Sequence, residues 1–116
     1  KTVEADCDPL LVVMLLTNLA NNAIKACKGN GRIILSCGIR DGSPYLSVSD
    51  NGVGMTAEQL TRITEPFYRT DKSRARNDGG TGLGLALCDR IVKAHGATLS
   101  FESTLGKGTT ATVIFN

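Results

Sequence analysis

The sequence predicts an α+β fold, a two-layer α/β sandwich in which a mixed β-sheet is covered on one face by helices. Two stretches in which every second residue is apolar, each interrupted by a glycine-containing turn, predict two β-hairpins. Two longer stretches with helical periodicity account for the helices. Strands and helices do not alternate in equal units, so a β-α-β arrangement is disfavoured and the helices are expected on one sheet face.

The length and charge of the chain limit what it can be. Its 116 residues are enough for one domain, which we expect to span residues 1–116. The net charge of +2 argues against a protein held mainly by nucleic acid backbones. No apolar run is expected to reach the roughly 20 residues of a membrane span. Because the chain opens at Lys1 and not at a methionine, we expect a fragment of a larger protein, whose membrane anchoring stays open.

The first half of the chain contains a helix, a hairpin and a short helix. An acidic segment with Pro9 precedes a helix predicted over residues 10–28, which ends at a Gly-Asn-Gly sequence. Strands follow at residues 32–40 and 45–50, joined by a turn over residues 41–44. Thr56 and Gln59 then have the spacing of a helix capping box.

The second half begins with a long basic loop over residues 65–82, and loops of this length in compact domains are usually functional. A helix is predicted over residues 83–95, closed by Gly96. Residues 97–103 and 109–115 form the second hairpin around a glycine-containing turn. Cys7, Cys27, Cys37 and Cys88 form no C-x-x-C pair, which disfavours a zinc site. Their spacing allows two disulfides, but we interpret them as reduced core thiols, because three of the four lie among apolar neighbours and a chain of this length needs no disulfides.

Three polar side chains follow one line along the first predicted helix. Asn18, Asn22 and Lys25 lie within a stripe some 60° wide if each residue turns the helix by about 100°. An amide oxygen suits Mg²⁺ and a nearby lysine suits phosphate. The periodicity alone favours a simpler interpretation, a solvated polar face.

A turn sequence follows the second predicted strand, at residues 50–54. The period of two places the Asp50 carboxylate on the same side as Leu46 and Val48, where a carboxylate needs a donor. The amino group of adenine could supply that donor, and Gly52 and Gly54 would let the backbone approach a flat ring. An Asx turn closing the strand explains the same residues equally well.

A glycine cluster at residues 78–85 leads from the basic loop into the helix that follows. Free amide groups and the helix dipole there favour an anion such as phosphate. A P-loop is disfavoured because no G-K-S/T sequence follows, and a mere hinge is as good an explanation. Arg69, Lys72, Arg74 and Arg76 could close over a triphosphate or form a solvated charged run.

These segments, in this order, resemble the ATP-binding catalytic domain of sensor histidine kinases, a branch of the Bergerat-fold ATPases. Residues 18–25 (NLANNAIK) resemble the N box, and residues 50–54 (DNGVG) the first glycine box. Residues 65–69 (EPFYR) resemble the F box, residues 80–85 (GTGLGL) the second glycine box, and residues 106–109 (GKGT) the closing glycine motif. The resemblance implies a Bergerat fold with an ATP lid.

The resemblance also implies roles for individual residues. Asn22 would be the Mg²⁺ ligand, Asp50 would bind the adenine amino group, and Asn18, Lys25 and Arg69 would contribute to catalysis. The residues implied to contact nucleotide are Asn18, Asn22, Lys25, Asp50, Gly52, Gly54, Phe67, Gly80, Thr81, Gly82, Leu83, Gly84 and Thr109. The partners implied are ATP, the histidine-bearing dimerisation domain of a homodimeric kinase and a response regulator, with no nucleic acid.

Asn18 indicates which branch of the superfamily the chain resembles. Hydrolytic relatives carry a glutamate at this place as a general base, and an amide cannot accept a proton. We therefore expect phosphoryl transfer from Mg-ATP to a histidine outside this chain, with His95 explained by the helix dipole. The alternatives are an anti-sigma-type serine kinase, another Bergerat ATPase, or a module that only binds ATP.

Overall fold

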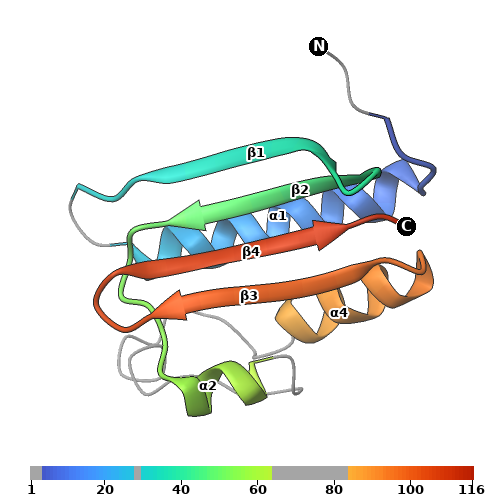
Figure 1. Cartoon of the computed structure of the whole chain (residues 1–116). Helices are drawn as coiled ribbons and strands as arrows, with labels where there is room; N and C mark the ends of the chain where they lie inside the picture. The colour runs from blue at the N-terminus through green and yellow to red at the C-terminus, as the bar shows by residue number, and fades with distance from the viewer. Residues whose placement is uncertain (1–3, 28–29, 64–83) are drawn as a thin grey trace.

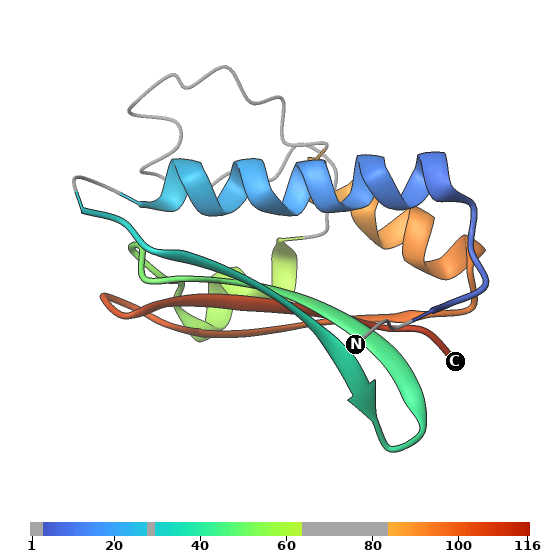
Figure 2. The same ribbon diagram turned by 90° about the horizontal axis from the view of Figure 1, so that it is seen from above.

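The computed structural model describes residues 4–27, 30–63 and 84–116 as two layers, a β-sheet and a helical layer. Helices α1 and α4 lie on one face of the sheet, and α2 lies beside its β3 edge (Figures 1 and 2). The elements in order are α1 (Pro9–Ala26), β1 (Ile33–Arg40), β2 (Ser43–Asp50), α2 (Ala57–Arg62), α4 (Gly84–Ala94), β3 (Thr98–Thr104) and β4 (Gly108–Ile114). The predicted two-layer α+β sandwich is confirmed.

The four described strands form one sheet in the order β1-β2-β4-β3. Two hairpins, β1–β2 and β3–β4, join through β2 and β4, and every pair is antiparallel. The expectation of a mixed sheet is therefore corrected among the described residues. Each hairpin is antiparallel by its short connection, and the junction between the hairpins happens to be antiparallel too.

The register defines which side chains face the helices. Val48 of β2 pairs with Ala111 of β4, and Ala111 pairs with Phe101 of β3, so these side chains point to one face. The helices meet that face with a buried stripe on α1 and another on α4. The buried core cluster consists of Leu15, Leu19, Ala23, Val48, Cys88, Ile91, Val92, Ala111, Val113 and Phe115.

Local sequence explains where the helices begin and end. The Asp8 carboxylate accepts the amide protons of Leu10 and Leu11, and Pro9 occupies the first helical position, so α1 begins there. It ends at Ala26, two residues before the predicted end. The predicted capping box of α2 is present, with Thr56 and Gln59 each accepting a backbone N–H of the other.

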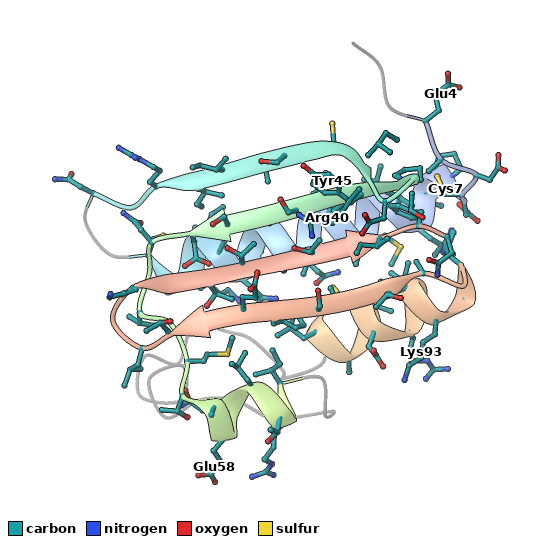
Figure 3. The ribbon with its side chains drawn as sticks, in the orientation of Figure 1. Glu4, Cys7, Arg40, Tyr45, Glu58 and Lys93 are labelled. Carbon is teal, nitrogen blue, oxygen red and sulfur yellow. The ribbon has the colours of Figure 1, made fainter. Side chains whose placement is uncertain are left out.

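The β1–β2 hairpin extends beyond the helical layer, and in Figure 2 its far end bends away from α1. The register places Leu35 and Ile39 on the helix-facing side, as their alternation predicts, yet they are 58% and 57% exposed. On the other face, the Arg40 guanidinium lies 4.7 Å from the centroid of the Tyr45 ring (Figure 3). Alternation thus predicted the face correctly but not its burial.

The cysteines are free thiols, but the expectation of four core thiols is wrong. Cys88 is fully buried, Cys27 is partly buried, and Cys7 and Cys37 are exposed. Cys37 lies on the poorly covered β1, and Cys7 lies in the segment before α1 (Figure 3). Apolar neighbours in the sequence therefore did not predict correctly which cysteines are buried.

Helix α1 is long and apolar enough, by length and composition, to cross a membrane, with a mean hydropathy of 1.2 over 18 residues. This differs from the sequence-based expectation. Leu15, Leu19 and Ala23 bury one stripe of the helix against the sheet and α4, although only 17% of the 18-residue window is buried. One helix of this kind near the N-terminus is weak evidence for a membrane span.

Candidate functional site

The polar stripe of α1 is continuous, because Asn18, Asn22 and Lys25 all lie within one unbroken helix. Asn18 is half-buried, and its Nδ2 donates a hydrogen bond to the Met14 carbonyl oxygen at 2.9 Å. That bond fixes which end of the amide is the acceptor, so Oδ1 is available on the other side. Asn22 and Lys25 are exposed.

The first residue of α4 lies against this stripe. A Cβ atom on Gly84 would stand 3.2 Å from Asn18 Oδ1, which is tighter than ordinary contact. The amino-terminal end of α4 therefore meets the α1 stripe, and free amide groups at such an end favour an anion. The rest of the second glycine box, Gly80, Thr81, Gly82 and Leu83, lies outside the described residues, as do Phe67 and Arg69 of the predicted lid.

Asp50 ends β2, at a sequence with two possible interpretations, an Asx turn and a contact with the amino group of adenine. One carboxylate oxygen, Oδ1, accepts the Gly52 N–H at 2.8 Å, so the Asx turn is present. Within the described residues the carboxylate makes no second hydrogen bond. Asp50 is half-buried on the helix-facing side, paired with Thr109 of β4. The turn therefore uses one carboxylate oxygen, and the other accepts no hydrogen bond from the described residues.

Two glycines of this segment are required by the protein's own packing. A Cβ on Gly52 would overlap the Ala26 carbonyl at the end of α1, and Val53 N donates to that same oxygen at 3.1 Å. Gly54 is buried with a φ of 68° against the Thr104 carbonyl. The segment is thereby held between α1 and the β3–β4 turn, a reason for glycine that the sequence did not disclose.

The structure adds Ser103, which no sequence motif indicated, and gives a contact for Asn51, which the sequence indicated only as a member of the first glycine box. The Ser103 Oγ accepts the Met55 N–H at 2.8 Å and lies 2.8 Å from the Thr109 Oγ1. The Asn51 Oδ1 accepts the Arg32 N–H at 2.7 Å, joining the first glycine box to the start of β1. Ser103 belongs to no motif. Only the strand register, which aligns Ser103, Thr109 and Asp50 across the sheet, could have indicated Ser103.

His95 has a structural role at the opposite end of α4. Its Nε2 accepts the Asp8 N–H at 2.9 Å, so this nitrogen carries no proton, and Nδ1 donates to the Ile91 carbonyl at 2.9 Å. Helix α4 separates His95 from Gly84 by about 15 Å at 1.5 Å per residue. The lone pair that a phosphoacceptor would need is occupied.

The fold and this arrangement define a class, the two-layer ATP-binding domains in which a polar helix and a glycine-rich turn share a nucleotide site. Residues 7–116 match the family described as histidine kinase-, DNA gyrase B-, and HSP90-like ATPase. The chain belongs to this family.

Curated relatives include two sensor histidine kinases of Bacillus subtilis, YkoH and WalK. They are 42% and 38% identical over 98% and 95% of this chain, which spans only 26% and 18% of their lengths. The phosphate regulon sensor protein PhoR of Pseudomonas aeruginosa is 43% identical over 85% of this chain and 22% of its own length.

Solved structures agree with this assignment. A mycobacterial sensor histidine kinase, MprB, matches with a TM-score of 0.85 and 25% identity over 96% of this chain and 75% of its own. Full-length ShkA, solved in complex with AMPPNP, matches with a TM-score of 0.78 and 31% identity over 90% and 21% of the respective chains. The prediction of an ATP-binding catalytic domain of the sensor histidine kinase type is confirmed.

Proposed function

We propose that this domain, spanning residues 1–116 of a larger kinase, binds Mg-ATP and transfers the γ-phosphoryl group to a histidine on a separate dimerisation domain. The observation that carries the proposal is the meeting of the α1 stripe with the start of α4, at Asn18 and Gly84. Asn18 Oδ1 lies at the start of α4, where free amide groups favour an anion, and Asn22 and Lys25 continue the same polar stripe along α1. Asp50 lies on the same helix-facing side of the sheet.

The residues present fit a magnesium ion carried by a triphosphate. Asn22 is exposed on α1 and makes no hydrogen bond within the described residues, so its amide oxygen is available as a hard neutral ligand. Bound Mg²⁺ would neutralise charge on the phosphate oxygens. Asn22 would hold the metal, and Asn18 and Lys25 would contact phosphates or metal-bound water.

The remaining roles divide between the base and the phosphates. Asp50 would accept a hydrogen bond from the adenine amino group, beside Gly52, Gly54 and Thr109. Phe67 and Arg69 of the lid, with Lys25, would exclude water and stabilise charge on the transferred group. The second glycine box is proposed to hold phosphates with its backbone amides through Gly80, Thr81, Gly82, Leu83 and Gly84.

Transfer rather than hydrolysis is supported by two side chains. Asn18 stands where hydrolytic relatives hold a glutamate, and its amide cannot act as a general base. His95 is bonded through both ring nitrogens at the far end of α4, so it is a poor acceptor. The acceptor histidine is therefore proposed to come from another domain of a homodimeric kinase, with a response regulator as the next acceptor.

The experiment that tests this function identifies the phosphorylated amino acid. The catalytic domain is mixed with γ-labelled Mg-ATP and the dimerisation domain of its parent kinase, and the product is treated with acid and with alkali. Acid-labile, alkali-stable label on the dimerisation domain is expected. Acid-stable label would instead indicate a serine kinase, and ATP binding without any transfer would indicate a binding module.

The cellular location of the domain is inferred from its proposed substrate. ATP is an intracellular substrate, so the domain is proposed to lie in the cytoplasm. Whether its parent is anchored in a membrane is answered by fractionating cells that produce the full-length kinase.

A further inference from the structure

Ser103, a half-buried residue of β3, uses one hydroxyl group to contact three residues, Met55, Gly108 and Thr109. Its Oγ accepts the Met55 N–H at 2.8 Å, and it donates to the Gly108 carbonyl at 2.9 Å. It also lies 2.8 Å from the Thr109 Oγ1. Met55 follows the first glycine box, and Gly108 and Thr109 begin β4, so Ser103 ties the adenine-side turn to the strand beside it.

The number of protons determines the direction of the third hydrogen bond. A serine hydroxyl has one proton to donate and two lone pairs that accept. The proton is used on Gly108, and one lone pair is used by Met55. The other lone pair therefore accepts the proton of Thr109. Once Thr109 has donated its single proton to Ser103, its Oγ1 can only accept hydrogen bonds from a ligand.

Asp50, which pairs with Thr109 across the sheet, also offers only hydrogen-bond acceptors. The register pairs Asp50 with Thr109 and Thr109 with Ser103, so the three side chains share the helix-facing side. An ionised carboxylate only accepts, and one Asp50 oxygen already accepts the Gly52 N–H. Two neighbouring side chains thus offer acceptors, and neither offers a donor.

We propose that Ser103 is a positioning residue that makes this site prefer a base with an amino group over a base with a carbonyl oxygen at the same place. It acts by holding the Thr109 hydroxyl as an acceptor. The inference rests on the proposed function, because it requires the base of ATP to lie against Asp50. Without Ser103, the Thr109 hydroxyl can rotate and donate its proton to a carbonyl oxygen.

The test compares the dissociation constants of ATP and inosine triphosphate, which carries a carbonyl oxygen in place of the adenine amino group. Ser103→Ala should lower the preference for ATP roughly three- to tenfold, the equivalent of one hydrogen bond. Loss of the Met55 contact would weaken both nucleotides together, so the ratio separates the proposed role from a merely structural one. Ser103→Thr keeps the hydroxyl and should restore the ratio.

A matched control lies on the opposite face of the sheet. Ser49 and Thr110 form a hydroxyl–hydroxyl hydrogen bond of 2.9 Å between β2 and β4, one residue away from the Asp50–Thr109 pair. Ser49→Ala removes a comparable bond, and it should leave the nucleotide ratio unchanged. Thr109→Val should lower the ratio, and adding Ser103→Ala to it should lower the ratio no further, because Ser103 acts through Thr109.

The outcomes separate this inference from the proposed function. A wild type that prefers ATP, with an unchanged ratio in Ser103→Ala, would overturn the inference alone. Should Ser103→Ala fail to fold, an unchanged ratio in Thr109→Val would overturn it equally. A wild type that binds neither nucleotide would overturn the proposed function and this inference with it.

Discussion

Asn22 is the residue whose side chain is proposed to contact the metal. Because it is exposed, Asn22→Ala should leave the fold intact while removing a magnesium ligand. We expect ATP affinity in Mg²⁺ to fall roughly tenfold, about the free energy of one ligand bond to a charged partner, and phosphotransfer to be lost. Calorimetric titration measures the affinity with and without EDTA. Asn21→Ala, an exposed neighbour, is the control, and equal Mg-ATP affinity in both variants would refute the assignment.

Asp50 is proposed to recognise adenine, and Asp50→Asn separates that role from its turn. An asparagine keeps the oxygen that accepts the Gly52 N–H, so the Asx turn should persist. ATP should bind roughly tenfold more weakly, because a charge-assisted hydrogen bond becomes a neutral one. Competition binding with ATP and GTP checks this. Equal affinity of the wild type for the two nucleotides would show that Asp50 does not recognise adenine.

Cys88 should make the stability of the folded domain depend on pH in the alkaline range. Burial raises the pKa of its thiol from 9.0 to about 12. The folded state therefore keeps a proton that the unfolded state releases above pH 9, so stability is lost as the pH rises from about 9 towards 12. Urea denaturation across this range should show a shallower decline in Cys88→Ala than in the wild type. Parallel declines would exclude the contribution of Cys88.

At the scale of elements, the connection between the first glycine box and the β3–β4 turn should be the most sensitive to substitution. Gly54 has a φ of 68°, and an added Cβ would overlap the Thr104 carbonyl. Gly42 has a φ of 82° with nothing within 4 Å of an added Cβ. Gly42→Ala should cost about 1 kcal/mol of backbone strain alone.

Gly54→Ala should cost several times more, roughly 3 kcal/mol or above, since the backbone must move as well. Urea denaturation of the two variants measures the difference. Equal losses of stability would mean that the packing of Gly54 on β3 contributes nothing.

The elements also show which parts of a fold local sequence can predict. Helices and strands were predicted in their correct order, because capping residues such as Asp8 and Thr56 and a period of two are local signals. The burial of a side chain could not be predicted from local sequence in the same way. Leu35 faces the helices as its alternation requires, yet α1 lies mainly over β2, so the residue stays exposed. The absence of a parallel pair among the four described strands likewise depends on how two distant hairpins meet.

At the scale of the whole molecule, the α1 stripe and the Asp50 turn could be found from spacing and a family resemblance. Ser103 could not, because its place near Asp50 depends on the pairing of β2 with β4, whose segments lie more than 50 residues apart in sequence, as well as on the local β3–β4 hairpin. The glycines were identified for their closeness to a ligand, whereas Gly52 and Gly54 pack against Ala26 and Thr104. The functional roles of the motif residues thus stay predictions, and the structure adds a packing reason for Gly52 and Gly54.

This domain is proposed to hold ATP and to pass the γ-phosphoryl group to a histidine outside the chain. The most direct test incubates the isolated chain with Mg-ATP labelled on the γ-phosphate, measuring nucleotide binding and covalent label in the same sample. We expect bound nucleotide, essentially no covalent label, and acid-labile label on the dimerisation domain once that domain is added. Stoichiometric label on the isolated chain that disappears in His95→Gln would contradict this proposal.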